Sequence, residues 1–364
     1  MKLDIATEKD NEQLCSLMKK VSMPGSIELI YARDPNFFDG LNIQGKFNQA
    51  IKCVVDKEIV GIGCRSIKPM YINSKKKDVG YLSGLRGIEK YRRGTFLARG
   101  YKYLKLLNED KRAAGYITTI IEDNKTAKTA LTGARAGLPD YLDYDKFFTY
   151  AVIINKRRKK KKTHGFTIRK ARQTDKKKII SFLQQEGKKK QFFPHYEEND
   201  FSSGYTKDFN WDDFYIAQKG GEIAGTLAKW NQSKYKQTKV VKYNNLLKFF
   251  RPLLNIFLMT AGLAPLPKIN CELKMFFISF ICIKNNNNEI FNALLNEVYE
   301  DNKRKNYHFF GVGLHEKDPL NKSMKLFHNI CYVSRLYIVF WENQKKFYDS
   351  LNKDYIPYLE LASL

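Results

Sequence analysis

The stretch DVGYLSGLRGIEKYRRGTFLARGYKYLKLLNED, residues 78–110, decides the fold that we expect for this chain. Its first part has a period of two, which is typical of a strand, and the period then lengthens to three and four, which is typical of a helix packed on a sheet. The stretch therefore predicts a strand, a tight basic turn and a helix. The strand period is carried by Val79, Tyr81, Ser83 and Leu85, and the helix period by Phe96, Gly100, Tyr103, Leu104 and Leu107.

The turn between these two elements reads YRRGTFLA, residues 91–98. The start of a helix presents unpaired N–H groups and the positive end of the helix dipole, and a glycine there lets a phosphate approach the backbone. Arg92 and Arg93 add two guanidinium groups beside Gly94. The turn predicts a pyrophosphate site. The alternative is an ordinary surface turn, because short phosphate-loop patterns recur by chance.

A second strand and helix follow in residues 116–136, YITTIIEDNKTAKTALTGARA, with Asp123-Asn124 as the expected helix cap. The order of elements and the motifs resemble the GNAT superfamily of acyl-CoA-dependent N-acyltransferases. That family has a central strand, a loop of pattern R/Q-x-x-G-x-G/A, a helix, a further strand and an N-x-x-A-x-x-L-Y helix. Tyr91-Arg92 fall on the family's Y-R, and Asn124 and Ala127 fall on its later helix.

The match to the family's motifs is incomplete. Thr95 and Leu97 stand at the glycine positions of the loop, and Gly94 lies one place early. Leu131 stands where the family often has a tyrosine that protonates the departing thiolate of coenzyme A. The resemblance therefore implies the fold and the acyl-CoA more directly than it implies the usual acid.

By this resemblance, the first part of the chain binds acetyl-CoA or another acyl-CoA as a co-substrate, without a metal. The pantetheine would add to the backbone of the central strand, and the pyrophosphate would lie on the turn. The residues that the resemblance assigns to the acyl-CoA are Leu85, Gly87, Ile88, Arg92, Arg93, Gly94, Thr95, Phe96, Leu97, Ala98 and Asn124.

The expected reaction is the direct attack of an amine on the thioester, which needs a base, a held carbonyl and an acid for the thiolate. Tyr81 and Ser83 share one face of the central strand, where family members often place a base or a water relay. Glu122 ends the next strand. Tyr141, with its neighbour Tyr144, is the candidate replacement for the missing tyrosine. A structural role is the alternative for each of these residues.

The chain divides into two expected domains, residues 1–155 and 166–364, joined by a basic linker at 156–165. The sequence NKRRKKKKT at 155–163 predicts a solvated linker, with a phosphate-binding arm or a transport signal as the alternative. FTIRKARQTDKKKIISFLQQ, from Phe166, parallels LDIATEKDNEQLCSLMKK near the N-terminus, and a hairpin follows both. We therefore expect a tandem pair of GNAT-like α/β domains, each with a mixed, mostly antiparallel twisted sheet flanked by helices.

The second domain differs where the phosphate turn would be. Its strand at 273–283 is followed by KNNNN, residues 284–288, without arginine or glycine. We therefore expect the first domain to bind coenzyme A and the second not to bind it. We also expect the second domain to pack against the first, where it would wall the site and select the acceptor amine.

Three local elements complete the expected layout. Residues 26–32 predict a short helix, and residues 148–154 predict the strand that closes the first domain. The apolar run at 245–267 predicts a helix that covers the sheet or the other domain, with a membrane-surface role as the less favoured alternative. Polar or helix-breaking residues make this run a poor membrane span, and they are Lys248, Arg251, Pro252 and Asn255.

The net charge of +26 favours anionic partners. Lysine and asparagine are both abundant, which also results from a genome's base composition, and we favour that explanation over a dedicated nucleic-acid surface. The six cysteines lack C-x-x-C spacing and the five histidines lack partners at metal spacing, so we expect neither disulfides nor a metal site. The N-terminus has no apolar signal region, which predicts a cytoplasmic protein.

The sequence thus predicts an acyl-CoA-dependent N-acyltransferase that acts on an amine of unknown identity. The acetyl group is the acyl group that we favour. One alternative is a catalytically inactive acyl-CoA-binding or interaction module, which an assay of turnover would separate. A further alternative is a tRNA- or ribosome-binding protein that uses the basic surface, which RNA binding across a salt series would separate.

Overall fold

The computed structural model describes residues 1–91, 95–133, 137–159 and 165–364. We call residues 1–155 the N-terminal half and residues 166–364 the C-terminal half. The N-terminal half has strands β1 (Lys2–Ile5), β2 (Ile27–Ala32), β3 (Phe47–Val55), β4 (Glu58–Ile72), β5 (Lys75–Gly87), β6 (Tyr116–Ile121) and β7 (Asp140–Ile153), with helices α1 (Asn11–Lys20), α2 (Phe37–Asn42), α3 (Phe96–Leu107) and α4 (Lys125–Thr132).

The C-terminal half contains the remaining strands and helices of the described residues. Its strands are β8 (Thr167–Lys170), β9 (Lys190–Gln191), β10 (Phe214–Lys219), β11 (Glu222–Trp230), β12 (Gln237–Tyr243), β13 (Met275–Ile283), β14 (Phe309–His315), β15 (Asn329–Phe340) and β16 (Ile356–Pro357). Its helices are α5 (Lys176–Gly187), α6 (Asn245–Thr260), α7 (Asn288–Asn302), α8 (Asn321–Met324) and α9 (Lys345–Asp349).

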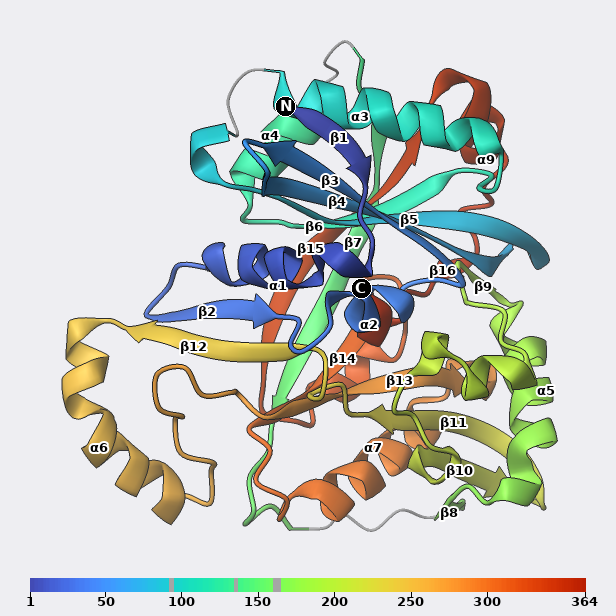
Figure 1. Cartoon of the computed structure of the whole chain (residues 1–364). Coiled ribbons are helices and arrows are strands. Elements are labelled where there is room, and N and C mark those ends of the chain that lie inside the picture. Colours follow the sequence, from blue (N-terminus) through green and yellow to red (C-terminus); the bar gives the residue numbers. More distant parts are fainter. Residues whose placement is uncertain (92–94, 134–136, 160–164) are drawn as a thin grey trace.

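In the described part of the chain, a sheet of twelve strands runs through both halves in the order β1-β3-β4-β5-β6-β15-β7-β14-β13-β11-β10-β8 (Figure 1). From either edge inward, the first four strands pair antiparallel and the fifth pairs parallel to the fourth. The structure confirms the expected class, a mixed α/β fold whose sheet is mostly antiparallel and flanked by helices.

At the centre of this sheet, the two halves exchange the last strand that each contributes to it. β15 of the C-terminal half lies between β6 and β7 of the N-terminal half and pairs antiparallel with both. β7 in turn pairs antiparallel with β14, in a register that joins Phe309 to Ile153 and His315 to Phe147. The expected closing strand at 148–154 is therefore the second part of a longer strand. The division into two domains at 156–165 stays a prediction, and strands from both sides of it share one ladder.

Helices cover both faces of the sheet in the N-terminal half (Figure 1). α1 and α2 pack on the face turned toward the C-terminal half, where Leu14 and Leu41 join a core with Cys64 of β4. α3 packs on the opposite face, where Leu104 joins a core with Tyr116 of β6. We call these the inner and the outer face. The alternation of β5 places Tyr81 and Ser83 on the inner face and Leu82 on the outer face.

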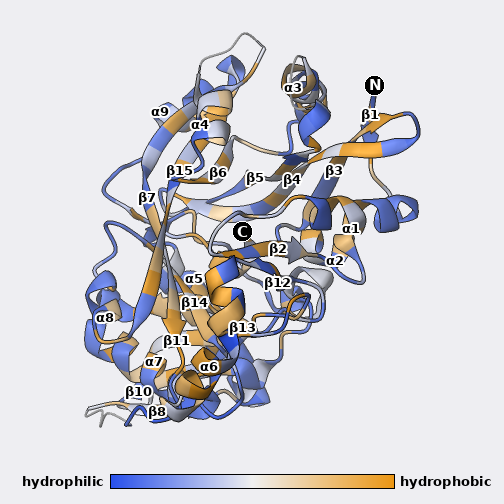
Figure 2. Ribbon diagram, turned by 90° about the vertical axis from the view of Figure 1, so that its left-hand side faces the viewer, coloured by the Kyte–Doolittle hydropathy of each residue, from blue (hydrophilic) through white to orange (hydrophobic). Residues whose placement is uncertain are grey.

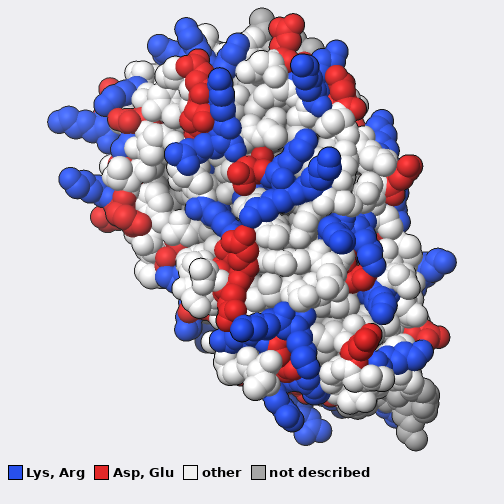
Figure 3. Space-filling view, turned by 90° about the vertical axis from the view of Figure 1, so that its right-hand side faces the viewer, with Lys and Arg blue, Asp and Glu red and all other residues white. Residues whose placement is uncertain are grey.

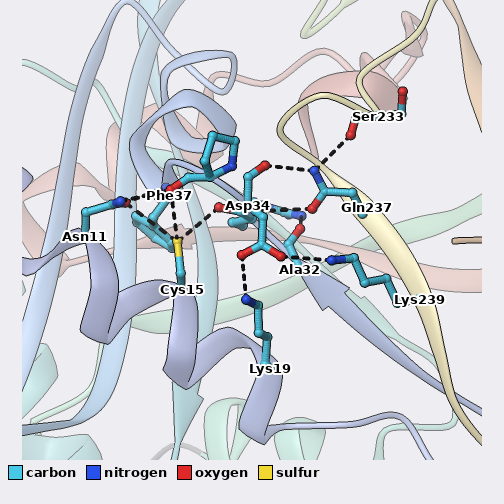
Figure 4. A network of polar contacts seen from close by, with 11 residues as sticks. Asn11, Cys15, Lys19, Ala32, Asp34, Phe37, Ser233, Gln237 and Lys239 are labelled. Atoms are coloured by element: carbon cyan, nitrogen blue, oxygen red, sulfur yellow. Dashed lines mark hydrogen bonds and ion pairs between the residues drawn. The ribbon is translucent and has the colours of Figure 1, made fainter. Parts of the chain in front are cut away.

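The expected helix at 26–32 is wrong, because these residues form strand β2. β2 pairs antiparallel with β12 across the two halves. The turn after β2 is held from both sides (Figure 4): the Asp34 carboxylate lies 2.7 Å from Lys19 Nζ and 2.9 Å from Lys239 Nζ. The Gln237 amide accepts from Asp34 N–H at 3.1 Å and donates to Asp34 O at 2.8 Å. The partner that makes these residues a strand lies about two hundred residues away in the sequence, beyond the reach of any local pattern.

The expected helix in the apolar run at 245–267 is present as α6, but the prediction that it covers the sheet or the other domain is wrong. None of its residues is buried. It lies at one corner of the molecule, next to the loop that follows it (Figure 1). Among the described residues, the helices are all too short or too polar to cross a membrane.

Candidate functional site

The parallel strands β5 and β6 diverge in the middle of the N-terminal half. Their register pairs are Gly80 with Tyr116 and Tyr81 with Ile117, although both strands continue beyond these residues. Just past the last pair, the Thr118 hydroxyl donates to Leu82 O at 2.7 Å. We call the continuation, Leu82–Gly87 of β5 opposite 118–121 of β6, the β5/β6 divergence.

A bulge in β5 lies within this divergence. The register of β4 and β5 shifts between the pair Cys64–Ser83 and the pair Ile62–Arg86. Gly84 has a φ of +63°, a left-handed conformation that glycine adopts without steric cost. Leu85 beside it is 47% exposed. The bulge turns this part of β5 out of the ladder with β4, so its backbone is placed for contact with a ligand.

Helix α3 begins close to the end of β5. A Cβ added at Gly61 of β4 would overlap the ring of Phe96, the first residue of α3, so the absence of a side chain at Gly61 lets this end of the helix approach the sheet. The N-cap residue Thr95 makes no side-chain cap hydrogen bond, and the first turn has no acidic residue. Among the described residues, no side chain therefore caps the first N–H groups of α3, and such groups can bind an anion.

A groove of about 630 Å³ runs along α3, between the helix and the segment before β7. Thr95 and Ala98 line it at the start of the helix, and Arg99, Lys102 and Lys105 line it farther along. The opposite side is formed by residues 137–140 and by the end of β15. The α3 wall of the groove thus carries three positive charges, while Asp140 and Glu342 on the opposite side carry negative charges, so a phosphate would be held at the α3 wall.

The residues predicted to bind the acyl-CoA fall into three groups. Arg92, Arg93 and Gly94 lie outside the described residues. Leu85, Gly87, Thr95, Phe96, Leu97 and Ala98 lie along the bulge of β5 and the first turn of α3. Two others serve the fold: Ile88 N–H donates to Val60 O at 2.9 Å, and the Asn124 side chain caps α4 by accepting from Ala127 N–H at 3.1 Å.

Two of the predicted catalytic residues lie beside the divergence on the inner face. Burial raises the pKa of Tyr81 to about 12, and its hydroxyl lies 3.4 Å from Thr119 Oγ1. Tyr81 is therefore a poor base. The Ser83 hydroxyl donates to Gln44 Oε1 at 2.6 Å. Gln44 follows α2 and is buried, and sequence reasoning missed it because an isolated glutamine carries no motif.

The other catalytic candidates are placed less favourably. Glu122 directly follows the C-terminal end of β6, and its carboxylate lies 3.9 Å from Arg335 of β15. Tyr141 lies level with Tyr116, at the paired end of the strands, and its hydroxyl is hydrogen-bonded to Tyr101 of α3. Burial, together with Tyr101, raises the pKa of Tyr141 well above its usual value. The assignment of Tyr141 as the replacement acid stays a prediction, and this buried, hydrogen-bonded position does not favour it.

The neighbouring candidate, Tyr144, is also in the core, where its ring packs against Phe192. Its hydroxyl is buried without a hydrogen-bond partner among the described residues. Tyr141 and Tyr144 therefore both pack in the hydrophobic core.

Sequence reasoning also missed a buried polar cluster between the halves. Lys68 of β4 donates to Ser363 Oγ at 2.7 Å, and burial lowers its pKa to about 8. Lys236 donates to Ala362 O at 3.0 Å and to Leu364 O at 3.1 Å, and burial and nearby cations lower its pKa well below its usual value. The final residues of the chain thus lie at the centre of the molecule, bound by lysines from both halves (Figure 1). Isolated lysines carried no signal in the sequence.

A second set of missed residues lies near the bulge of β5. Burial and the neighbouring Arg86 lower the pKa of Arg33 to about 10. Burial and the neighbouring Tyr332 of β15 raise the pKa of Tyr31 of β2. Tyr31 and Tyr332 remain 37% and 55% exposed. Two arginines and two accessible tyrosines from three distant segments therefore meet beside the divergence.

The C-terminal half has a counterpart of this divergence. β13 and β14 pair in parallel at Met275, Phe276 and Phe277 and then separate. Phe280 of β13 has a positive φ, +54°, and in this it resembles Gly84 of β5. Phe280, however, is buried. Its N–H donates to Glu360 Oε2 at 2.7 Å, and the next N–H, of Ile281, donates to the Tyr358 hydroxyl at 3.2 Å. The C-terminal segment therefore occupies the β13/β14 divergence.

The helix after β13 is also occupied at its start. The Asn287 side chain accepts from the N–H groups of Glu289 and Ile290, at 2.8 and 3.2 Å. Glu289 adds an acidic residue to the first turn of α7. A phosphate is disfavoured at this helix start for two reasons. The N–H groups already have an acceptor, and the Glu289 carboxylate would repel the phosphate.

The positive charge of the protein is spread over the surface shown in Figure 3. Lysine and arginine side chains are scattered over this face, with acidic and uncharged residues between them. A nucleic-acid surface would gather them into one stripe or patch. In the described residues, no group of three or more side chains is arranged to hold a metal ion.

No protein-family model and no curated protein sequence matches this chain. Several solved structures do match. The N-myristoyltransferase of Saccharomyces cerevisiae with bound myristoyl-CoA has a TM-score of 0.60 and 10% identity, over 93% of this chain and 82% of that chain. A GCN5-related N-acetyltransferase from Sphaerobacter thermophilus has a TM-score of 0.52 and 12% identity, over 79% of both chains.

A third match is the GCN5-related glucosamine N-acetyltransferase region of a fungal multi-domain β-N-acetylglucosaminidase. Its TM-score is 0.61 at 11% identity, over 93% of this chain and 38% of that chain. At such low identity these likenesses establish the fold. The chain therefore has the GNAT fold, as the strand and the helix of residues 78–110 predicted.

Proposed function

We propose that this protein is an acyl-CoA-dependent N-acyltransferase with one acyl-CoA site, at the β5/β6 divergence and the start of α3. The observation that carries the proposal is the combination of an exposed bulge at Gly84 and Leu85 with an uncapped helix start at Thr95. Both features serve the same ligand, because a pantetheine amide pairs with a strand edge and a pyrophosphate binds a helix N-terminus.

The phosphates of the acyl-CoA would be held by the first N–H groups of α3 and by the basic wall of the adjacent groove. Among the described cations that line this groove, Arg99 and Lys102 are nearest along the sequence to the first residue of α3. The sequence adds Arg92 and Arg93 to this set. The known fold matches include proteins that act with acyl-CoA, which supports this kind of co-substrate.

The acceptor amine would approach from the inner face, where Ser83 and Gln44 form a hydrogen-bonded pair beside the bulge. A backbone N–H at the bulge would polarise the thioester carbonyl. The amine nitrogen then forms a bond to the carbonyl carbon, the carbon–sulfur bond breaks, and the thiolate takes up a proton. Ser83 with a water molecule would relay the proton released by the amine.

Calorimetry with coenzyme A and a turnover assay test this proposal. We expect one site per chain, and release of free thiol from acetyl-CoA with at least one member of a panel of amines. Arg92→Ala with Arg93→Ala should weaken binding about tenfold or more, since each charge-assisted phosphate hydrogen bond contributes roughly 1.5 to 3 kcal/mol. Two sites per chain, or unchanged affinity in the double variant, would contradict the proposed site.

Binding of coenzyme A without turnover would identify the protein as an acyl-CoA-binding module. The role of Ser83 is tested separately, by the pH profile of kcat in Ser83→Ala. A proton relay predicts a lower kcat with a displaced pH profile, while a purely structural role predicts an unchanged profile.

A further inference from the structure

Helix α6 carries an apolar stripe that faces solvent. Six large apolar side chains at spacings of three and four residues lie on one side of it, and all are between 48% and 78% exposed. They are Leu246, Phe249, Phe250, Leu253, Ile256 and Phe257. In Figure 2 α6 faces the viewer, and most of its ribbon has hydrophobic colours. Exposed apolar residues scattered singly are ordinary, but a continuous stripe marks a contact surface.

The opposite side of α6 fixes the helix to the protein. Arg251 donates to Pro267 O at 3.1 Å, and Asn255 exchanges two hydrogen bonds with the backbone of Leu266, at 3.1 and 2.8 Å. Leu247 packs against the small core of Val240 and its neighbours on β12. The helix is therefore bound along one side, so the apolar stripe is turned outward by the structure of the loop.

The charge around α6 indicates what covers the stripe. From residue 242 to residue 271 the chain has four basic residues and no acidic residue. Lys242, Lys248 and Lys268 are exposed, and the chain as a whole has a net charge of +26. An apolar stripe flanked by lysines and rich in phenylalanine matches the interface of an anionic lipid bilayer, where rings enter the acyl region and ammonium groups meet phosphates.

We propose that α6 docks this protein on an anionic membrane surface, lying in the plane of the interface. A second copy of the chain is the competing occupant. A two-fold contact through α6 would bring the same lysines of both copies together without an acidic partner on the segment, which disfavours it. This inference is independent of the proposed acyltransferase activity, because it rests on residues outside that site.

Flotation of the full-length protein with vesicles tests the proposal. We expect binding to vesicles of phosphatidylcholine with phosphatidylglycerol, and much weaker binding to phosphatidylcholine alone. Phe249→Ser with Leu253→Gln and Phe257→Ser should lower the partition coefficient about tenfold or more, because three apolar side chains that would enter the bilayer are lost. The variant should keep its circular dichroism spectrum and Tm, since all three side chains are exposed.

Matched controls separate the stripe from general hydrophobicity and general charge. Leu106→Gln with Leu326→Gln removes two side chains that are 57% and 47% exposed elsewhere, and this variant should bind vesicles as the wild type does. Lys248→Gln should weaken binding to the anionic vesicles about fivefold and reduce its salt dependence.

Three results would overturn the proposal. The first is equal binding to neutral and anionic vesicles, and the second is full binding by the triple α6 variant. The third is a dimer in sedimentation that the triple variant dissociates, together with no binding of the wild type to either kind of vesicle. That last result would assign the stripe to a second copy of the chain.

Discussion

Both halves of this protein contain a pair of parallel strands that diverge, but a segment of the chain itself occupies only the divergence of the C-terminal half among the described residues. In the N-terminal half, the bulge at Gly84 is exposed and the following helix starts without a side-chain cap. In the C-terminal half, Phe280 has the corresponding positive φ, but its N–H is bound by Glu360 and the following helix is capped by Asn287. The polar groups that would meet a ligand in one half are satisfied by the protein in the other.

This difference shows how one architecture can keep two roles apart. A backbone N–H that is buried must find a partner, so the C-terminal half satisfies its divergence with a segment of its own chain. The same segment continues to Ser363, which Lys68 of the N-terminal half binds. The satisfied divergence of one half thereby helps to hold the other half in place.

The largest effect that we expect comes from separating the halves. A chain cut after Ile154 keeps β7 but loses both of its neighbours, β14 and β15, so it should aggregate or fail to fold. As a control, the full chain with a protease site in the linker 156–165 should stay in one piece after cleavage, because the strands interlock. Size-exclusion chromatography measures both. Separation of the cleaved pieces would show two independent sheets instead.

The next effect concerns Lys68, which joins the halves. Its pKa is lowered from 10.5 to about 8 in the folded protein, so the unfolded chain binds more protons between these values and stability should rise with pH across this window. The rise should be on the order of 3 kcal/mol. Lys68→Met should remove it. Urea unfolding at several pH values between 8 and 10.5 measures the difference between the two proteins, which isolates Lys68 from Lys236.

Glu360→Ala tests whether the C-terminal segment satisfies the β13/β14 divergence. It leaves the N–H of Phe280 buried without its acceptor, which should lower the free energy of unfolding by about 2 kcal/mol. Thermal and urea unfolding measure this, with Glu58→Ala at an exposed position as the control. Coenzyme A stoichiometry should stay at one, because Asn287 still caps α7. A second site in the variant would show that Glu360 alone excludes the ligand.

Gly61→Ala tests the start of α3. The added methyl group overlaps the Phe96 ring and should displace the first turn, weakening coenzyme A binding about tenfold through the loss of one phosphate contact. Gly100→Ala is the matched control on the same helix. A Cβ at Gly100 meets no described atom, so this change should leave affinity intact and stabilise the helix by roughly 0.5 to 1 kcal/mol. Equal affinities in both variants would argue against a site at this helix start.

The smallest effect compares the two helix starts directly. Asn287→Ala removes a cap from α7 and should cost about 1 kcal/mol of unfolding free energy, whereas Thr95→Ala should cost much less because Thr95 makes no cap bond. Chemical unfolding of the two variants measures this. Equal losses would mean that both helix starts are capped in solution and that the contrast between the halves is not real.

The sequence predicted the elements around residues 78–110 because each of them is decided by its own local pattern. The alternation of β5, the helix of α3 and the cap of α4 at Asn124 depend on residues within a few positions of one another. The distribution of chemistry was predicted less completely. Single residues such as Gln44, Lys68 and Arg33 become important through the residues that they contact in the folded chain. Tyr141 stands at the expected distance along the sequence, but its hydroxyl is bonded to Tyr101 in the core.

The sequence by itself determined the fold class, the strands and helices around residues 78–110 and the absence of arginine and glycine from the turn at 284–288. Only the tertiary structure decided that β15 lies between β6 and β7, that residues 27–32 form a strand, and that α6 faces solvent. The physical reason is the range of the interactions. A periodic pattern states which face of an element is apolar, whereas the partner of that face is chosen by surfaces far away in the chain.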